Sequence, residues 1–212
     1  HQRCLRSLAL GVVEGFCDDR HAALAAVLDQ QRHAGGHGDP RRFAVGHVGF
    51  VVLHDEFAEA RIGDADVVSP ADVRLAMTRA AVVGLDGIRV DDVEIRRGGP
   101  SYTAETLAHF SETQPGAELF LLLGSDIAPR LDTWVRPDEV RRRTTIVVMK
   151  RPGFEEGRPP AGWEHQVLHG SFPDLASNDL RERFAATGEL DDSVPAGVAE
   201  LIRAHGLYGI GA

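Results

Sequence analysis

The sequence predicts an α/β fold with a mostly parallel sheet and helices on both faces. Two short segments, LFLLL at residues 119–123 and TIVVM at 145–149, are apolar throughout. Such continuous runs are typical of central parallel strands that helices cover on both sides. Segments with helical spacing and capping residues alternate with these runs, and that alternation favours a parallel sheet over separate layers of strands and helices.

The first third of the chain gives weaker signals. Residues 21–30, HAALAAVLDQ, are predicted to be helical from their Ala and Leu content. Residues 31–42 contain Gly, His, Pro and charged residues and are predicted to form a loop. Residues 43–60, FAVGHVGFVVLHDEFAEA, look like a Gly-punctuated turn that leads into a helix over residues 51–60. We therefore expect no apolar first strand in this part of the chain.

The next elements have clearer boundaries. A helix is predicted after Ser69 as the N-cap, with Pro70 at its first position. The alternating segment IRVDDVEIRR predicts a strand over about residues 89–95. A Gly-Pro turn then leads into a helix that carries Leu107 and Phe110 on one side.

The residues after the strongest strand are the first candidates for a site. Gly124, Ser125 and Asp126 follow the LFLLL strand directly. Ligands of open α/β sheets bind beyond the carboxyl ends of the strands, so these residues are expected to lie near a ligand. The chain ends in a predicted helix that starts at Pro195 and stops at Gly206.

Composition excludes some classes of function. The formal net charge of −9 disfavours broad binding to nucleic acid, which needs many basic residues. No apolar run reaches the length of about 18 residues that a membrane span requires. Cys4 and Cys17 lack metal-finger spacing and are expected to be reduced thiols in a cytoplasmic protein. The run at residues 141–143 is expected to be a solvated helix end.

Four separated stretches form a recognisable set: GGPSYTAETL at 98–107, LLLGSDIAPRLDTW at 121–134, KRPGF at 150–154, and LASNDLRERF followed by VPAGVAELIRAHGLYG within 175–209. Together they resemble the bacterial nicotinate mononucleotide adenylyltransferases. Their order and spacing agree with the family over residues 69–209, about two thirds of the chain.

The resemblance implies a Rossmann-like nucleotidyltransferase fold and a reaction. Nicotinate mononucleotide would attack the α-phosphate of ATP and give deamido-NAD and pyrophosphate. Such a transfer depends mainly on positioned reactants and neutralised charge. Mg²⁺ would arrive with ATP, so no metal site made of protein ligands is implied.

The resemblance also assigns roles to individual residues. Gly124 and Asp126 would approach the nucleotide, and Asp126 would accept hydrogen bonds from sugar hydroxyls. Tyr102 and Thr103 would contact the nicotinate end, and Trp134 would stack on the pyridine ring. On the residues alone, a strand-end turn and a half-buried aromatic explain the same positions.

A second group would hold the phosphates of ATP. Ser177 and Asn178 would open a helix whose backbone donors, dipole and Arg181 bind phosphate, with Arg181 counted among the catalytic residues. Asn178 stands where the family usually has Thr. A plain helix cap with a surface arginine is the alternative.

The HVGF stretch at residues 47–50 resembles the His-x-Gly-His element of the family. In this alignment His47 is catalytic, Gly49 contacts ATP, and Phe50 replaces the second His. Loss of such a charge-stabilising donor can slow a reaction roughly 10²–10³-fold. The alternative function is therefore an impaired homologue that binds a mononucleotide with little transfer.

This alignment divides the chain into residues 1–42, a divergent segment of helix plus loop, and residues 43–212, a nucleotidyltransferase-like domain. The composition of residues 31–42 fits either genuine divergence or a shifted reading frame.

A different class, a metal-binding protein that uses His33, His37, His47 and His54, is disfavoured because their spacing matches no standard site. Related transferases that act on pantetheine phosphate or cytidine nucleotides are disfavoured by the GPSYT turn and the GSD…W spacing. The sequence does not decide between acid and amide mononucleotides, or between a monomer and a homo-oligomer.

Overall fold

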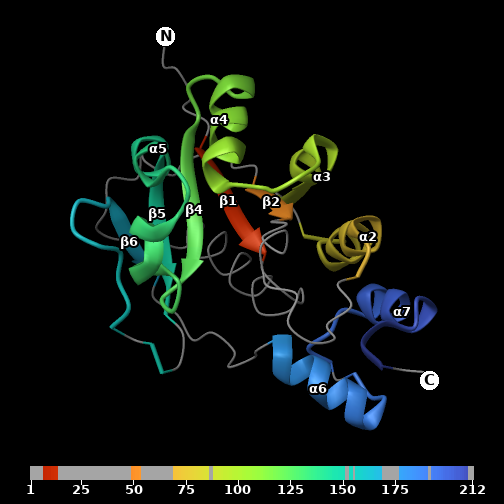
Figure 1. Ribbon diagram of the computed structural model, residues 1–212. Coiled ribbons are helices and arrows are strands. Elements are labelled where there is room, and N and C mark those ends of the chain that lie inside the picture. The colour runs from red at the N-terminus through yellow and green to blue at the C-terminus, as the bar shows by residue number, and fades with distance from the viewer. Residues whose placement is uncertain are drawn as a thin grey trace.

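One parallel six-stranded sheet organises the chain (Figure 1). The computed structural model describes residues 7–13, 49–53, 69–85, 88–150, 153–154, 156–168, 177–190 and 192–209. The strand order is β3-β2-β1-β4-β5-β6, and every neighbouring pair is parallel. The strands are β1 (Ser7–Val13), β2 (Gly49–Leu53), β3 (Ile88–Asp91), β4 (Glu118–Gly124), β5 (Thr144–Met149) and β6 (His165–Leu168). The predicted α/β class and the two buried strands are confirmed.

Strand β1 lies at the centre of the sheet, so the expectation that no first strand exists is wrong. It pairs with β2 on one side and with β4 on the other, and Gly11 is in register with both Val51 and Leu122. Its sequence SLALGVV combines Ala and Gly, which are depleted in strands, with two valines, which favour them. The local preference is therefore mixed, and pairing on both sides completes the strand.

Strand β2 overturns the predicted turn-to-helix junction. Residues Gly49–Leu53 are extended, and Phe50 is in register with Leu10 of β1 and Arg89 of β3. The helix predicted over residues 51–60 is therefore wrong at 51–53, where two adjacent valines suit a strand. Residues 54–60 and the helix predicted over residues 21–30 lie outside the described residues.

Helices connect the strands and cover the sheet. They are α2 (Ala71–Ala81), α3 (Val93–Arg97), α4 (Thr103–Thr113), α5 (Pro137–Arg143), α6 (Ser177–Thr187) and α7 (Ala196–Ala204), with 3₁₀ turns η2 (Ala128–Thr133) and η3 (Leu207–Gly209). The helix after Ser69 is confirmed, although Pro70 is its N-cap. The tail helix is also confirmed, with Pro195 as its N-cap. The strand predicted over residues 89–95 ends at Asp91, and α3 follows.

Alternate residues of β4 enter different hydrophobic clusters. Leu121 and Leu123 pack with Leu107 of α4 and Ile146 of β5, whereas Leu122 packs with Val147 in a second cluster. Burial on both faces explains why β4 contains no polar side chain between its ends.

A third cluster joins α2, α6 and α7. Val73, Phe184 and Ile202 are among its buried members. Tyr208 adds a polar contact, because its hydroxyl lies 3.2 Å from the hydroxyl of Ser69 at the start of α2. The tail of the chain is thereby fixed to α2. Among the described residues, no helix is long and apolar enough to cross a membrane.

Leu121→Ala should lower the free energy of unfolding by about 2–5 kcal/mol, because the fully buried side chain leaves a cavity in the centre of the sheet. Urea denaturation followed by circular dichroism measures the change. Val83→Ala is the control, since Val83 is 78% exposed and its truncation should change stability by less than about 0.5 kcal/mol. Equal stabilities of Leu121→Ala and the wild type would contradict the central position of β4.

Candidate functional site

The GSD turn closes the carboxyl end of β4. The backbone N–H of Ser125 donates to the carbonyl of Met149 at 2.9 Å, so the turn is attached to the last residue of β5. The N–H of Ile127 then donates to the carbonyl of Gly124 at 3.1 Å and completes the turn. Ser125 is fully buried, whereas Gly124 and Asp126 are half-buried. The turn therefore presents a glycine backbone and a carboxylate at the edge where ligands of parallel sheets bind.

A distant loop lies directly against this turn. A Cβ placed on Gly157 would overlap the carbonyl oxygen of Ser125 and would lie 3.2 Å from the carbonyl oxygen of Phe154. A residue with a side chain therefore does not fit at position 157 unless the Ser125 carbonyl or the loop moves. This contact was not predicted from the sequence. Ser125 and Gly157 lie 32 positions apart, and neither residue type indicates a contact over that distance in the chain.

The segment between the GSD turn and Trp134 is held in place by a hydrogen bond from Trp163. Trp163, which is buried among α5 and the strands, donates its indole N–H to Asp132 Oδ1 at 2.7 Å. Trp134 follows η2 directly, is half-buried, and packs against the same hydrophobic cluster. Sequence reasoning missed Trp163, although it is one of only two tryptophans in the chain.

The GGPSYT turn precedes helix α4. Gly98 and Gly99 have φ values of +68° and +72°, which residues with a Cβ rarely adopt. Tyr102 is the N-cap of α4, and its carbonyl accepts hydrogen bonds from Glu105 at 2.9 Å and Thr106 at 3.3 Å. Ser101 and Thr103 are buried, and Tyr102 is half-buried. The turn thus presents Tyr102 at the positive end of a helix.

A buried pair fixes the two sides of that turn. The hydroxyl of Thr106 in α4 donates a short hydrogen bond to Glu94 Oε1 in α3. Both side chains are almost fully buried, so breaking the bond would leave polar groups in an apolar environment. The bond therefore holds the start of α4 against α3.

A more exposed pair lies at the start of α3. Arg96 Nε donates to Asp92 Oδ1 at 2.5 Å, and this hydrogen bond holds the pKa of Asp92 below its ordinary value. A depressed carboxyl pKa means that the pair contributes stability near neutral pH and loses it as the pH falls through the lowered pKa. The contribution is small because both groups are in contact with solvent.

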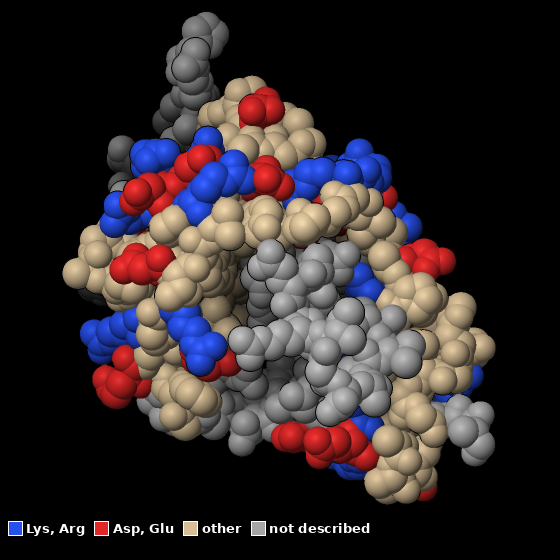
Figure 2. Space-filling view, viewed as in Figure 1, with Lys and Arg blue, Asp and Glu red and all other residues tan. Residues whose placement is uncertain are grey.

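An ion pair connects the GGPSYT turn with the Trp134 segment. Arg136 Nη2 lies 2.7 Å from Glu105 Oε1, and Arg97 Nε lies 3.5 Å from Glu105 Oε2. Arg136 is two residues after Trp134, and Glu105 is three residues after Tyr102. Figure 2 shows basic and acidic side chains adjoining across the face formed by α3, α4 and α5. The two predicted contacts for a pyridine ring therefore belong to segments that are joined directly.

Helix α6 supplies the candidate phosphate-binding group. It opens with Ser177 and Asn178, and the half-buried Arg181 follows one turn later. Leu180 and Phe184 are buried and fix the helix to its neighbours. The arrowheads of β1 and β4 point toward the side of the molecule where α6 lies (Figure 1). The helix is thus on the ligand side of the sheet.

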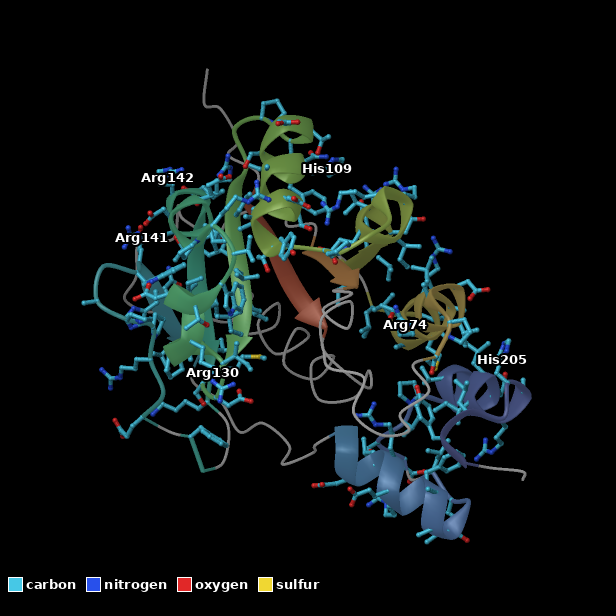
Figure 3. All side chains as sticks on the ribbon, viewed as in Figure 1. Arg74, His109, Arg130, Arg141, Arg142 and His205 are labelled. Carbon is cyan, nitrogen blue, oxygen red and sulfur yellow. The ribbon has the colours of Figure 1, made fainter. Side chains whose placement is uncertain are left out.

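Arg130 is a further basic residue on this side that sequence reasoning missed. It belongs to η2 and is exposed. Figure 3 shows it near the carboxyl ends of β4 and β5, whereas Arg141 and Arg142 lie at the opposite end of the sheet. The expectation that residues 141–143 form a helix end is confirmed by α5, which ends at Arg143.

The structure does not bring Gly49 to the predicted site. Gly49 opens β2 at the amino end of the sheet, in register with Ile88, the first residue of β3. Leu10 is in register with both Phe50 and Leu121, so Gly49 is level with Phe120 and four residues below Gly124. That offset is about 13 Å along the strands. Phe50 therefore does not occupy a phosphate turn, and His47 lies outside the described residues.

These features suit a phosphorylated nucleotide ligand. The described residues include a glycine–carboxylate turn at the carboxyl end of β4, two half-buried aromatic residues, Tyr102 and Trp134, and the start of helix α6 on the same side of the sheet as that turn (Figure 1). Helix starts bind phosphate, aromatic faces stack on planar rings, and carboxylates accept hydrogen bonds from sugars. Among the described residues, no group of three or more His, Cys, Asp or Glu could hold a metal ion.

Comparison with curated proteins finds probable nicotinate-nucleotide adenylyltransferases among the relatives of this chain. A probable nicotinate-nucleotide adenylyltransferase from Salinibacter ruber is 34% identical over 145 residues, which cover 68% of this chain and 74% of that protein. One from Gemmatimonas aurantiaca is 31% identical over 194 residues, 82% of this chain and 90% of that protein. One from Dehalococcoides mccartyi is 29% identical over 213 residues, 95% of this chain and 98% of that protein. No family model matches the chain.

Solved structures agree at the level of the fold. Plasmodium falciparum nicotinic acid mononucleotide adenylyltransferase complexed with NaAD has a TM-score of 0.64 at 15% identity, over 96% of this chain and 97% of that one. The same enzyme complexed with APC has a TM-score of 0.64 at 13% identity over the same shares. The Rossmann-like architecture expected from the sequence is confirmed.

Gly157→Ala should lower the free energy of unfolding by about 1–3 kcal/mol, because the new methyl group must displace the Ser125 carbonyl or its own loop. Urea denaturation measures the loss. Glu156→Ala, an exposed neighbour in the same loop, is the control and should be close to neutral. If Gly157→Ala is as stable as the wild type, the loop does not press on the GSD turn.

Proposed function

Because this chain belongs to the nicotinate-nucleotide adenylyltransferase family, we propose that it transfers the adenylyl group of ATP to nicotinate mononucleotide. The products are deamido-NAD and pyrophosphate. The observation that carries this proposal is the Glu105–Arg136 ion pair, which joins the segment of Tyr102 to the segment of Trp134. Such a site can hold a pyridine ring next to a nucleotide.

The reaction needs little covalent help from the protein. A phosphate oxygen of the mononucleotide attacks the α-phosphorus of ATP, and the bond to the β-phosphate oxygen breaks as pyrophosphate leaves. Holding the two phosphates in line removes much of the entropic barrier, and nearby positive charge stabilises the developing negative charge. The chain's task is therefore to orient two nucleotides and to neutralise phosphates.

In this proposal the mononucleotide binds between the GGPSYT turn and the Trp134 segment. Trp134 stacks on the pyridine ring, and Tyr102 and Thr103 contact its carboxylate end at the start of α4. Gly124 allows close approach of the nucleotide, and Asp126 accepts hydrogen bonds from its sugar. The half-burial of Trp134 supports this role, because a stacking face must remain accessible.

ATP binds at the start of α6. Backbone donors at Ser177 and Asn178 hold its phosphates with the aid of the helix dipole, and Arg181 contributes a charge-assisted hydrogen bond in the transition state. Mg²⁺ is carried by the ATP phosphates and neutralises them. No role is assigned to Gly49, because it opens β2 at the amino end of the sheet.

The alternative, an impaired homologue that binds but transfers poorly, rested on Phe50 as a replacement for a catalytic His. Phe50 is a residue of strand β2, so this reason no longer holds. Strand β1 ends at Val13, and ligands of open α/β sheets bind beyond the carboxyl ends of their strands, so Phe50 near the amino end of β2 gives no reason to expect impaired transfer. Transfer activity is therefore the preferred function.

Incubation of the protein with ATP, Mg²⁺ and nicotinate mononucleotide tests the proposal. Release of pyrophosphate together with deamido-NAD, identified by chromatography, is expected. A parallel reaction with nicotinamide mononucleotide measures the preference between acid and amide. Saturable binding of both nucleotides without any product would instead identify the impaired homologue.

Trp134→Ala should raise KM for nicotinate mononucleotide about three- to tenfold and leave KM for ATP nearly unchanged, because stacking is lost at one subsite. Arg181→Ala should show the opposite selectivity, with a larger effect on ATP. Steady-state kinetics with each substrate varied in turn measures both. Trp134→Phe, which keeps a stacking face, should restore most of the affinity. Equal losses for both substrates in both variants would show that the two subsites are assigned wrongly.

A further inference from the structure

Arg136 has an unusual backbone for a residue with a side chain. Its φ of 55° and ψ of 54° lie in the left-handed region, and Tyr208 is the only other non-glycine residue with a positive φ among the described residues. The left-handed conformation is disfavoured for any residue with a Cβ, and glycine adopts it freely. Such a conformation persists only when surrounding contacts enforce it.

The contacts of Arg136 connect two elements that local structure does not join. Its guanidinium lies 2.7 Å from Glu105 in the first turn of α4 and 3.9 Å from Glu139 in α5. Its carbonyl accepts hydrogen bonds from the N–H groups of Glu139 at 3.0 Å and Val140 at 3.3 Å, so it is also the N-cap of α5. Arg136 thus starts α5 and links that helix to α4.

A glycine at this position could adopt the same backbone conformation and still cap α5. The N-cap contacts use only the main chain, and a glycine would remove the conformational strain. What a glycine could not supply is the link to Glu105. The side chain therefore has a purpose beyond forming the turn.

We propose that Arg136 is a positioning residue that sets Trp134 relative to Tyr102 through its ion pair with Glu105. This inference rests on the proposed function, in which those two aromatic residues contact the mononucleotide. Trp134 is only two residues before Arg136, so the backbone between them leaves little freedom once the guanidinium is held. Arg136 itself touches neither substrate. It sets the spacing between Tyr102 and Trp134, which contact the mononucleotide.

Arg136→Gly should change the affinity for the mononucleotide without lowering the stability of the protein. Arg136→Gly relieves the left-handed strain, so its melting temperature should equal or exceed that of the wild type. KM for nicotinate mononucleotide should nevertheless rise about two- to fivefold, the range expected for loss of an exposed ion pair, with KM for ATP unchanged. A purely structural role would lower stability and affect both substrates alike.

Two further variants test whether Arg136 acts through Glu105. Glu105→Gln should raise the mononucleotide KM by a similar factor, and adding it to Arg136→Gly should cause little additional change. Arg141→Ala is the matched control, because Arg141 lies in α5, the helix that Arg136 caps, has a similar side-chain exposure of 41%, against 42% for Arg136, and pairs with Asp138 in that helix. Its KM values should equal those of the wild type.

The outcomes are distinct. Failure of the wild type to release pyrophosphate would count against the proposed function and is measured first. In an active wild type, an unchanged mononucleotide KM in Arg136→Gly overturns the positioning role. A rise in KM that is shared equally by ATP, or that is simply additive with Glu105→Gln, overturns it as well.

Discussion

The pairing of β4 between β1 and β5 is the constraint on which the site depends. β4 is buried on both faces, with Leu121 on one side and Leu122 on the other, so it cannot slide or rotate without exposing apolar surface. Because every described strand is parallel, the carboxyl ends of neighbouring strands reach the same edge of the sheet. The GSD turn is then fixed by its hydrogen bond to Met149. The position of Asp126 follows from packing that lies well away from any ligand.

From this edge outward, the site is assembled by a few contacts of different physical kinds. The contact between Gly157 and Ser125 is steric and permits no side chain. The bond from Trp163 to Asp132 and the bond from Thr106 to Glu94 are buried or partly buried hydrogen bonds. Each of these two hydrogen bonds contributes on the order of 1 kcal/mol to the free energy of folding. That is small beside the contribution of the hydrophobic core but enough to favour one arrangement of the loops. The core fixes the sheet, and these contacts fix the turns that would meet a ligand.

The fold is kept among proteins whose sequences differ widely. The fold is shared with a Plasmodium enzyme at 13% identity, which is possible because packing tolerates many apolar substitutions that keep volume and pattern. Higher identity, 34%, is found with a bacterial relative over 68% of the chain. The segments that resemble the family lie in residues 69–209, where the structure confirms the predicted helix after Ser69 and the two buried strands.

The sequence by itself determined the α/β class, the strands β4 and β5, the GSD turn at a strand end and the capped helices α2, α4 and α7. These features follow from local signals: continuous apolar runs, Pro at helix starts, and Gly in turns. Tertiary structure decided β1 and β2, because the short segments SLALGVV and GFVVL contain valines that suit strands but become strands here by pairing with a neighbour on each side. It also decided the links between Arg136 and Glu105 and between Trp163 and Asp132, each of which joins residues 31 positions apart. No local pattern in a chain specifies such a contact, since its geometry exists only after the sheet has brought the two segments together.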